Sequence, residues 1–330
     1  MEQAGKDERP VVALDIGGTK ILATLVSAGY EVLDREFAPT PAGNGPQEIN
    51  GSLFMAIDRL LQKSRRKASD IAAIGLAAAG IIDLASGLMT ISPNLPRWED
   101  IPLRELVSAR YGVYAALVND ASAAALGEHR LGAGRGLDNM VYLTISTGIG
   151  GGLIVNGQLY LGSSGSAGEL GHMVIDVNGP EGTCGHCGCL ESLASGRAIA
   201  RETIERLKKG QASSLSQAFG GRIESITARD VGAAARNGDG LAGEVVRQAA
   251  VYLGIGLTSI VNIFNPDMIV IGGGVAKMGE LLLEPARQVV AERAFKLPAS
   301  AVKIVPARLG DDAGVLGAAL FARQQKAEAG

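Results

Sequence analysis

Val11-Val-Ala-Leu-Asp-Ile-Gly-Gly-Thr-Lys-Ile-Leu-Ala-Thr-Leu-Val26 places two aliphatic runs on either side of a Gly-Gly pair. Such runs around a glycine turn predict a β-hairpin. The stretch from Val141 to Val155 repeats this plan, with a turn of sequence Ser-Thr-Gly-Ile-Gly-Gly-Gly at 146–152. Because the hairpins begin about 130 residues apart, they predict an internal duplication with one copy in each of two domains.

Strands and helices alternate along the rest of the chain, which predicts the α/β fold class. Helices are expected over 46–68, 103–111, 121–131, 199–209, 228–236, 241–263, 280–294 and 314–325. Further strands are expected over 71–80, 114–118, 268–271 and 302–306. We place a small first domain at 1–120, with the C-terminal helix at about 312–330 assigned to it, and a large second domain at 121–311. The sequence alone leaves the packing of that last helix open.

Composition narrows the class of protein. The 330 residues are 47% hydrophobic but only 4% aromatic, with a net charge of −3, which is typical of a soluble chain with an aliphatic core. The sequence therefore lacks the excess of basic residues typical of nucleic-acid-binding proteins. It also lacks the cationic stripe typical of proteins that bind a membrane surface. Glycines interrupt the apolar runs short of a membrane span, and the polar residues 1–10 do not resemble a secretory signal. We therefore expect a cytoplasmic protein.

All three cysteines of the chain, Cys184, Cys187 and Cys189, fall within six positions. Together with His172, twelve residues upstream of the first of them, they can close a tetrahedral structural zinc site. His186 competes with His172 as the imidazole ligand. The alternative is that the cysteines are small buried hydrophobes, but a Gly-rich stretch offers little core to bury them. Clustered thiolate ligands also fit a reducing compartment.

Three glycine turns predict a nucleotide site. Asp15 ends a strand directly before Gly17-Gly18, where bare amides can approach phosphate oxygens and the acid can hold Mg²⁺, directly or through water. Taken alone, such a turn can also be an ordinary hairpin turn that binds nothing. The glycine spacing is not that of a Walker A loop. The turn at 146–152, which adds hydroxyls, and the glycines at 272–274 after a strand make phosphate binding the better interpretation.

Asn119-Asp120 ends an expected strand and precedes an Ala-rich helix. In open α/β sheets, ligands bind at the carboxyl ends of strands, so this pair is a candidate for catalysis. A helix N-cap is the competing interpretation, because Asn and Asp are common caps. Taken alone, the pair favours the cap.

Five motifs in order resemble the ROK family of sugar kinases and repressors: Asp-Ile-Gly-Gly-Thr-Lys, Asn-Asp-Ala, Ser-Thr-Gly-Ile-Gly-Gly-Gly, Gly-Glu-Leu-Gly-His and Cys-Gly-x-x-Gly-Cys-Leu-Glu. The resemblance runs from about Val11 to Ala322. It implies the actin-like ATPase (ribonuclease H-like) fold, with two related α/β domains around a cleft that takes ATP and a hexose.

The resemblance also implies roles for individual residues. Asp120 is the expected base that takes the proton from the sugar hydroxyl. The expected sugar contacts are Gly80, Asn94, Asn119, Asp120, Glu169, His172 and Glu191. The expected nucleotide contacts are Asp15, Gly17, Gly18, Thr19 and Lys20 in the first loop, Thr147, Gly148 and Gly150 in the second, and Gly273 and Gly274 beside the adenosine. His172 is expected to serve both zinc and sugar, one ring nitrogen for each.

The chain departs from the family pattern at two places. The family's cysteine motif is Cys-x-Cys-Gly-x-x-Gly-Cys, and here Gly182 occupies the first cysteine position while Cys187 lies inside the Gly-x-x-Gly. We predict that Cys187 supplies the missing zinc ligand. The family often has Pro-Gly where this chain has Ala79-Gly80, and Gly80 is expected to keep its role.

The expected activity is ATP-dependent phosphorylation of glucose at the 6-hydroxyl, with structural Zn²⁺ and with Mg²⁺ accompanying ATP. N-acetylglucosamine, N-acetylmannosamine, fructose or allose are alternative substrates, and the residues do not decide the sugar or the phosphate donor. A sugar-responsive repressor is less expected, because only ten residues precede Val11 and family repressors carry a helix-turn-helix domain there.

The resemblance implies a homodimer or homotetramer. Residues 241–263 could contribute to its interface, although filling the core is the more expected role for most of them.

Overall fold

The computed structural model describes residues 7–95, 97–182 and 184–329, so the first six residues of the polar N-terminal stretch lie outside the description. The chain forms two compact units. Unit 1 holds the chain up to residue 135, residues 159–167 and the chain from 311 onward; unit 2 holds 136–158 and 168–310. The predicted α/β class is confirmed by the elements of both units. The domain boundary at residue 120 stays a prediction.

Unit 1 is built on the first predicted hairpin. Its strands are β1 (Val11–Ile16), β2 (Lys20–Val26), β3 (Val32–Pro39), β4 (Ala73–Ala78), β5 (Ile81–Asp83), β6 (Leu88–Ile91) and β7 (Ala115–Asn119). Its helices are α1 (Pro46–Lys63), α2 (Leu103–Tyr111), α3 (Asp120–Leu131) and α11 (Ala313–Ala329). The 3₁₀ turns η1 (Ala68–Asp70) and η5 (Gly310–Asp312) follow α1 and precede α11. The helix predicted over 46–68 ends earlier because Arg65 adopts a left-handed conformation, with φ of 55°.

The main sheet of unit 1 has the strand order β3-β2-β1-β4-β7. β1 is antiparallel to β2, which confirms the hairpin, and parallel to β4, which is parallel to β7. Ile16 pairs with Ala78, and Ala78 pairs with Asn119. The carboxyl ends of three neighbouring strands therefore lie level at one edge of the sheet.

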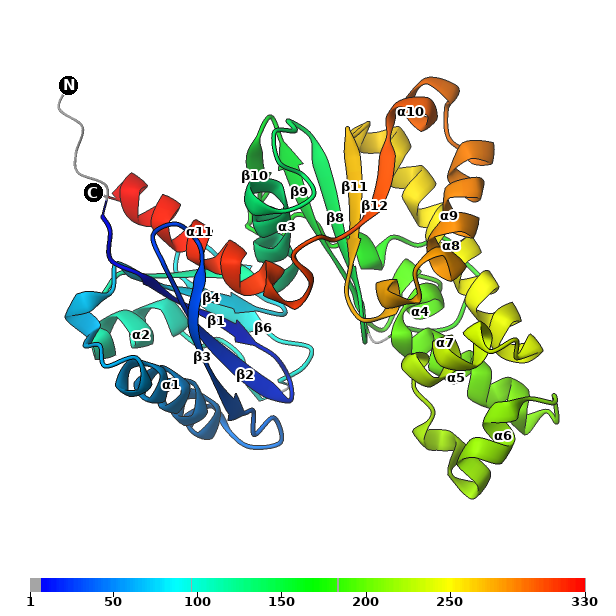
Figure 1. Ribbon diagram of the computed structural model, residues 1–330, viewed down its shortest axis with the longest axis horizontal. Helices are drawn as coiled ribbons and strands as arrows, with labels where there is room; N and C mark the ends of the chain where they lie inside the picture. The colour runs from blue at the N-terminus through cyan, green and yellow to red at the C-terminus, as the bar shows by residue number, and fades with distance from the viewer. Residues whose placement is uncertain (1–6, 96, 183, 330) are drawn as a thin grey trace. The chain divides into compact units, whose positions relative to one another are not determined.

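Helices cover both faces of this sheet. α1 packs on β2 and β3, and α2 on β7, whereas α11 packs on β1, β4 and β7 and against α3; Figure 1 shows α1 and α2 on one side of the sheet and α11 on the other. The core is aliphatic, as predicted, and Trp98 is fully buried with its Nε1 donating to Asn50 Oδ1 at 2.9 Å.

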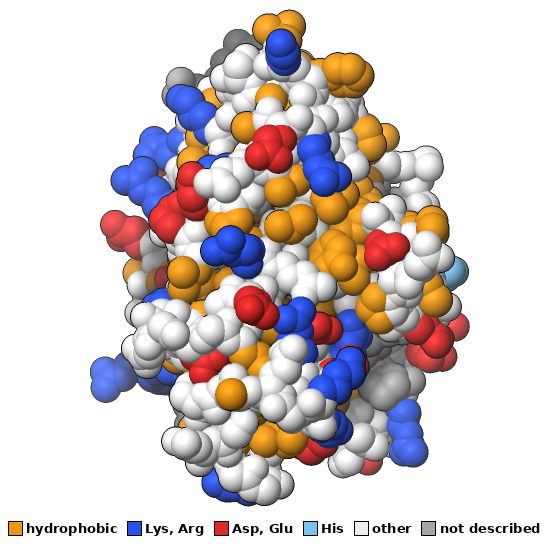
Figure 2. Space-filling view, turned by 90° about the vertical axis from the view of Figure 1, so that its right-hand side faces the viewer, with side chains coloured by type: hydrophobic (Ala, Val, Ile, Leu, Met, Phe, Trp, Pro, Cys, Tyr) orange, Lys and Arg blue, Asp and Glu red, His pale blue; other side chains and the backbone are white. Residues whose placement is uncertain are grey.

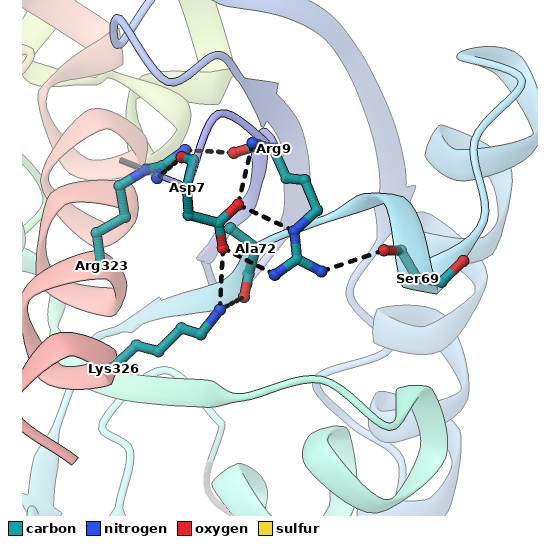
Figure 3. A network of polar contacts seen from close by, with 6 residues as sticks. All are labelled: Asp7, Arg9, Ser69, Ala72, Arg323 and Lys326. Atoms are coloured by element: carbon teal, nitrogen blue, oxygen red, sulfur yellow. Dashed lines mark hydrogen bonds and ion pairs between the residues drawn. The ribbon is translucent and has the colours of Figure 1, made fainter. Parts of the chain in front are cut away.

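A polar network ties the chain ahead of β1 to α11 (Figure 3). Lys326 donates to the carboxylate of Asp7 at 3.1 Å and to the carbonyl of Ala72 at 2.9 Å, and Arg323 donates to the carbonyls of Asp7 and Arg9. The hydrogen bonds from Arg9 hold the pKa of Asp7 well below its usual range. The C-terminal helix is therefore bound to unit 1 by apolar packing and by charge.

Unit 2 repeats the plan of unit 1. Its strands are β8 (Met140–Ile145), β9 (Ile149–Val155), β11 (Met268–Gly272) and β12 (Lys303–Pro306), with β10 (Gln158–Tyr160) where the chain leaves the unit. The strand order is β10-β9-β8-β11-β12. β8 is antiparallel to β9 and parallel to β11, which is parallel to β12. Because the first sheet has the same succession of pairings, the predicted duplication is confirmed.

The helices of unit 2 are α4 (Leu190–Ala194), α5 (Gly196–Lys208), α6 (Ser214–Phe219), α7 (Ala228–Arg236), α8 (Gly240–Phe264), α9 (Glu280–Arg293) and α10 (Lys296–Ala301). Short 3₁₀ turns are η2 (Leu170–His172), η3 (Gly220–Ser225) and η4 (Val275–Met278). Figure 2 looks onto the helical side of this unit and shows basic, acidic and apolar side chains interspersed.

α8 lies at the centre of these helices, in contact with α4, α5, α7 and α9. Among the residues described, it is the one helix long and apolar enough to cross a membrane by length and composition. The expectation that glycines interrupt every such run is therefore wrong for α8, because the helix continues through Gly254 and Gly256. Half of its most apolar window is buried inside the described structure.

Candidate active site

Two carboxylates meet at the strand ends of unit 1. Asp15 pairs with Ala77, and Ala77 with Val118. Asp120 comes two residues after Val118, so both acids lie at the same end of the sheet. Burial raises the pKa of Asp15 to about 6; the negative charge of Asp120 adds to the rise and Lys20 opposes it. Burial also raises the pKa of Asp120, against the hydrogen bond from the Ala121 N–H. A cation bound here would relieve the repulsion between the two acids.

Asn119 is the N-cap of α3, which confirms the cap interpretation. Its Oδ1 accepts from the N–H groups of Ala121 and Ser122 at 2.9 and 3.1 Å, while its Nδ2 donates to the carbonyl of Gly80 at 3.2 Å. Gly80 has a φ of +134°, and a Cβ there would lie 2.1 Å from the carbonyl oxygen of Ile91. The turn therefore requires glycine, and the amide of Asn119 is held in one orientation beside Asp120.

The first glycine turn is fastened from outside the hairpin. The hydroxyl of Thr40 donates to the carbonyl of Gly17 at 2.7 Å, and the N–H of Thr40 donates to the carbonyl of Thr19 at 3.0 Å. A Cβ at Gly18 would lie 2.9 Å from the Cβ of Asn94. The structure therefore brings Asn94, an expected sugar contact, onto the turn expected to hold phosphate.

The second glycine turn, in unit 2, contacts an acid from the stretch that carries the cysteines, residues 184–191, which we call the cysteine loop. The N–H of Ile149 donates to Glu191 Oε2 at 2.8 Å. A Cβ at Gly148 would lie 2.3 Å from the same oxygen. Because Glu191 lies in the first turn of α4, two residues after Cys189, the turn and the cysteine loop share this carboxylate.

Two further glycines border the same turn. Gly273 has a φ of +87°, and a Cβ there would lie 2.4 Å from the carbonyl oxygen of Ile145; a Cβ at Gly274 would lie 3.9 Å from Ser146 Oγ. The N–H of Gly196, at the start of α5, donates to the carbonyl of Ser146 at 2.8 Å. The third predicted glycine cluster is thus next to the second.

Three of the predicted zinc ligands form one group. His172, Cys184 and Cys189 each offer a ligand atom within 4.8 Å of the others. The two sulfur atoms lie 4.0 Å apart. Zn–S bonds of about 2.3 Å in a tetrahedral arrangement separate two sulfurs by about 3.8 Å, so this set of donors fits zinc. Glu169 Oε2 lies 3.8 Å from His172 Nε2, which sets an expected sugar-binding acid beside the group.

Main-chain hydrogen bonds connect the two ends of the segment 173–190. The N–H of Leu190 donates to the carbonyl of Met173 at 2.8 Å, and the N–H of Ile175 donates to the carbonyl of Gly188 at 2.9 Å. An isolated antiparallel bridge between Val174 and Cys189 therefore places Cys189 close to His172, the last residue of η2. The group of three includes neither Cys187, which is exposed, nor His186, so the identity of the fourth ligand stays a prediction.

The predicted residues fall into two groups, one in each unit. Unit 1 holds Asp15, Gly17, Gly18, Thr19, Lys20, Gly80, Asn94, Asn119 and Asp120. Unit 2 holds Thr147, Gly148, Gly150, Glu169, His172, Cys184, Cys187, Cys189, Glu191, Gly273 and Gly274. Sequence reasoning missed Thr40, which fastens the first turn, and Gly196, which supports the second. The Ser195-Gly196 pair was a detectable signal, because Ser195 is the N-cap of α5.

Known proteins match nearly the whole chain. The family model described as ROK family matches residues 11–325. A glucokinase of Halalkalibacterium halodurans is 37% identical over 97% of this chain and 96% of its own length. A xylose repressor of Caldicellulosiruptor bescii is 32% identical over 96% of this chain and 78% of its own length.

A solved structure is similar over the same extent. It is a ROK family glucokinase from Streptomyces griseus in complex with glucose and AMPPNP, which is 34% identical with a TM-score of 0.83. The match covers 96% of this chain and 99% of that one.

Proposed function

The chain belongs to the ROK family, and from this premise we propose that it is an ATP-dependent glucokinase that transfers a phosphoryl group to the 6-hydroxyl of glucose. The actin-like ATPase fold expected from the resemblance is that of its structural relatives. The observation that carries the proposal is the similarity to glucokinases over nearly the full length of both chains.

Asp120 is the proposed general base. A sugar hydroxyl is a weak nucleophile at neutral pH, so a carboxylate that accepts its proton in the transition state aids the reaction. Burial raises the pKa of Asp120, which makes its carboxylate a stronger base. Asp120 Oδ1 accepts from the Ala121 N–H at 2.9 Å, so the second oxygen is the one proposed to face the hydroxyl.

The proposed sugar contacts divide between the units. In unit 1, Asn119 offers its second amide hydrogen, since the first is bound to the carbonyl of Gly80. In unit 2, the proposed contacts are Glu169 and His172, which lie 3.8 Å apart, and Glu191. We propose that both groups bind one glucose molecule, with Gly80 and Asn94 completing the contacts from unit 1.

The proposed nucleotide contacts are main-chain amides of the two glycine turns, with the side chains of Thr19, Lys20 and Thr147. Phosphoryl transfer needs mainly alignment and neutralisation of charge, and such turns provide both. Mg²⁺, which neutralises phosphate charge when bound, fits the buried pair of acids, and Asp15 would hold it directly or through water. Gly273 and Gly274 are proposed to lie beside the adenosine.

Zinc is proposed as a structural ion held by His172, Cys184 and Cys189, with Cys187 as fourth ligand and His186 as the alternative. The distance of 4.0 Å between the sulfur atoms of Cys184 and Cys189 supports this site. A zinc ion here would hold His172 and Glu191 still, because Glu191 follows Cys189 by two residues. Its proposed function is therefore to position sugar contacts, not to react.

The acids named above would serve other hexoses and N-acetylhexosamines equally, so a kinase for one of those sugars is the alternative. A coupled assay of ADP release against glucose, N-acetylglucosamine, N-acetylmannosamine, fructose and allose decides between them. We expect glucose to give the highest kcat/KM. Preference for another sugar would replace the substrate, and ADP release with none of them would refute a hexose kinase.

A sugar-responsive repressor is the less favoured function. The xylose repressor of Caldicellulosiruptor bescii is 32% identical to this chain, whereas two glucokinases match it at 36–37% identity. A gel-shift experiment at low salt is expected to show no sugar-dependent DNA binding.

We also propose a cytoplasmic homodimer or homotetramer. The large apolar side chains of Ile263, Phe295 and Leu297, at the end of α8 and around the start of α10, are 68, 73 and 81% exposed. Their exposure supports an interface with a second copy through unit 2. Light scattering on the purified protein tests this, and a monomer at micromolar concentration would contradict it.

A further inference from the structure

Arg197 is anchored to the second glycine turn by its own main chain. Its N–H donates to the carbonyl of Thr147 at 3.3 Å, and the preceding N–H, of Gly196, donates to the carbonyl of Ser146 at 2.8 Å. A Cβ at Gly196 would lie 2.6 Å from that carbonyl oxygen of Ser146, so only glycine permits this approach. The Cα of Arg197 is therefore fixed beside the turn expected to bind phosphate.

The side chain of Arg197 is unpaired within the described part of the chain. It is exposed, and the structure gives it no hydrogen bond or ion pair with any described residue. The arginines further along α5 differ: Arg201 donates to the carbonyl of Ser192 at 2.6 Å, and Arg206 pairs with Glu202 at 2.7 Å. The cation at position 197 is thus available to a ligand.

Its place in the helix makes this cation unfavourable for folding. Arg197 is the second residue of α5, and the described first turn of that helix contains no acid. The helix dipole disfavours positive charge at this end. A bound anion would reverse the balance, because it would be attracted to the guanidinium as well as to the helix.

We propose that Arg197 binds the phosphate chain of the nucleoside triphosphate, an inference that rests on the proposed kinase function. The guanidinium is planar and offers several N–H donors in a geometry that matches phosphate oxygens. It supplies the positive charge that the second turn otherwise lacks, since Ser146, Thr147 and the glycines are uncharged. Arg197 is then a third phosphate-binding element, alongside the two glycine turns.

The test compares Arg197→Ala with Arg197→Lys and with Arg229→Ala. Arg229 is the matched control, because it is also exposed and also the second residue of a helix, α7. Affinities for ATP, ADP and adenosine are measured by calorimetry, with the KM for glucose beside them. A charge-assisted hydrogen bond contributes about 1.5–3 kcal/mol, so Arg197→Ala is expected to weaken ATP and ADP binding by about tenfold or more.

Affinity for adenosine and the KM for glucose are expected to stay unchanged in Arg197→Ala, Arg197→Lys is expected to recover part of the loss, and Arg229→Ala to bind as the wild type does. Folding is not at risk, because removing a cation from the first turn relieves the helix dipole. Unchanged ATP affinity, or an equal loss for adenosine, would overturn the inference. A wild type that binds ATP through Arg197 but phosphorylates no hexose would instead overturn the proposed function alone.

Discussion

The carboxylate of Glu191 accepts a hydrogen bond from the main-chain N–H of Ile149, with 2.8 Å between nitrogen and oxygen. Ile149 belongs to the second glycine turn, and Glu191 follows Cys189 by two residues. One bond therefore joins the turn proposed to bind phosphate to the loop proposed to bind sugar and zinc. Displacing that carboxylate should affect both substrates.

Gly148→Ala tests this coupling. The added Cβ would lie 2.3 Å from Glu191 Oε2, so either the carboxylate or the turn must move. A lost hydrogen bond to a charged group costs about 1.5–3 kcal/mol. We expect the KM for ATP and the KM for glucose to rise together, each by about tenfold or more, in steady-state kinetics.

Gly243→Ala is the control for a glycine substitution in the same unit. Gly243 lies in α8 with no heavy atom within 4 Å of the added Cβ, and alanine favours a helix by up to about 1 kcal/mol. Its kinetics should match the wild type and its melting temperature should not fall. A Gly148→Ala enzyme with both KM values unchanged would contradict the coupling.

Asp120→Asn tests the general base. The amide is close to isosteric but cannot accept the proton, so kcat is expected to fall by about 10²–10⁴-fold. Glucose affinity, measured by calorimetry without ATP, should remain within a few-fold because the hydrogen-bonding positions persist. Near-normal turnover in this variant would rule out the assignment.

Asp15 should lower the stability of the nucleotide-free protein at neutral pH. Its pKa is raised to about 6 by burial and by Asp120, from an ordinary value of 3.8. Between these two values the native state binds the proton and the unfolded state releases it, so stability falls as pH rises from about 4 to 6. A rise of about two pKa units corresponds to about 3 kcal/mol. The free energy of unfolding is lowered by this full amount above pH 6 and is not lowered below pH 4.

Asp15→Asn removes this cost and is expected to raise the free energy of unfolding by up to about 3 kcal/mol at pH 8, with little gain at pH 4. Urea denaturation at both pH values measures the difference, and activity should be lost in the same variant. Equal gains at both pH values would show that the charge of Asp15 is not the cause.

Cys184→Ser and Cys189→Ser should release zinc. Their sulfurs are the pair 4.0 Å apart, and loss of either ligand opens the tetrahedron. Elemental analysis is expected to find about one equivalent in the wild type and far less in the variants, whose KM for glucose should rise as His172 and Glu191 lose their positions. Well under one equivalent in the wild type would contradict a zinc site.

Cys187→Ser identifies the fourth ligand. If Cys187 completes the site, this variant loses zinc as the other two do, and His186→Ala keeps it. The reverse result would assign the position to His186. The exposure of Cys187 also allows a direct measurement, since a metal-bound thiolate should react slowly with a thiol reagent until a chelator is added.

The sequence predicted those elements and site residues that short local patterns determine. The two hairpins follow from aliphatic runs around glycine, and Asp15 and Asp120 were identifiable because each stands where a buried strand ends. The histidine and two of the cysteines were recognisable from their clustering alone. The family resemblance then assigned roles to positions that a single pattern left ambiguous, such as Asn119, which is a helix cap as well as a proposed sugar contact.

Contacts between distant segments were not predictable in this way. Gly196 supports Ser146 from fifty positions away, and its necessity comes from a carbonyl 2.6 Å from the missing Cβ, which no local pattern records. The end of the first helix was also missed. A single residue, Arg65, determines it by adopting a positive φ. The fourth zinc ligand depends on the conformation of a short glycine-rich loop, which spacing does not fix.

Gly317→Ala tests the close packing of α11 on α3, the helix whose first residue is Asp120. A Cβ at Gly317 would lie 1.7 Å from the carbonyl oxygen of Ala123, a main-chain atom that cannot move without its helix. Overpacking of this kind costs about 1–3 kcal/mol or more, so the melting temperature should fall. Because α3 must shift to make room, kcat should fall as well, even where the variant remains folded. Gly314→Ala in the same helix is the control, since nothing lies within 4 Å of its added Cβ. If both variants melt and turn over alike, the base does not depend on this helix contact.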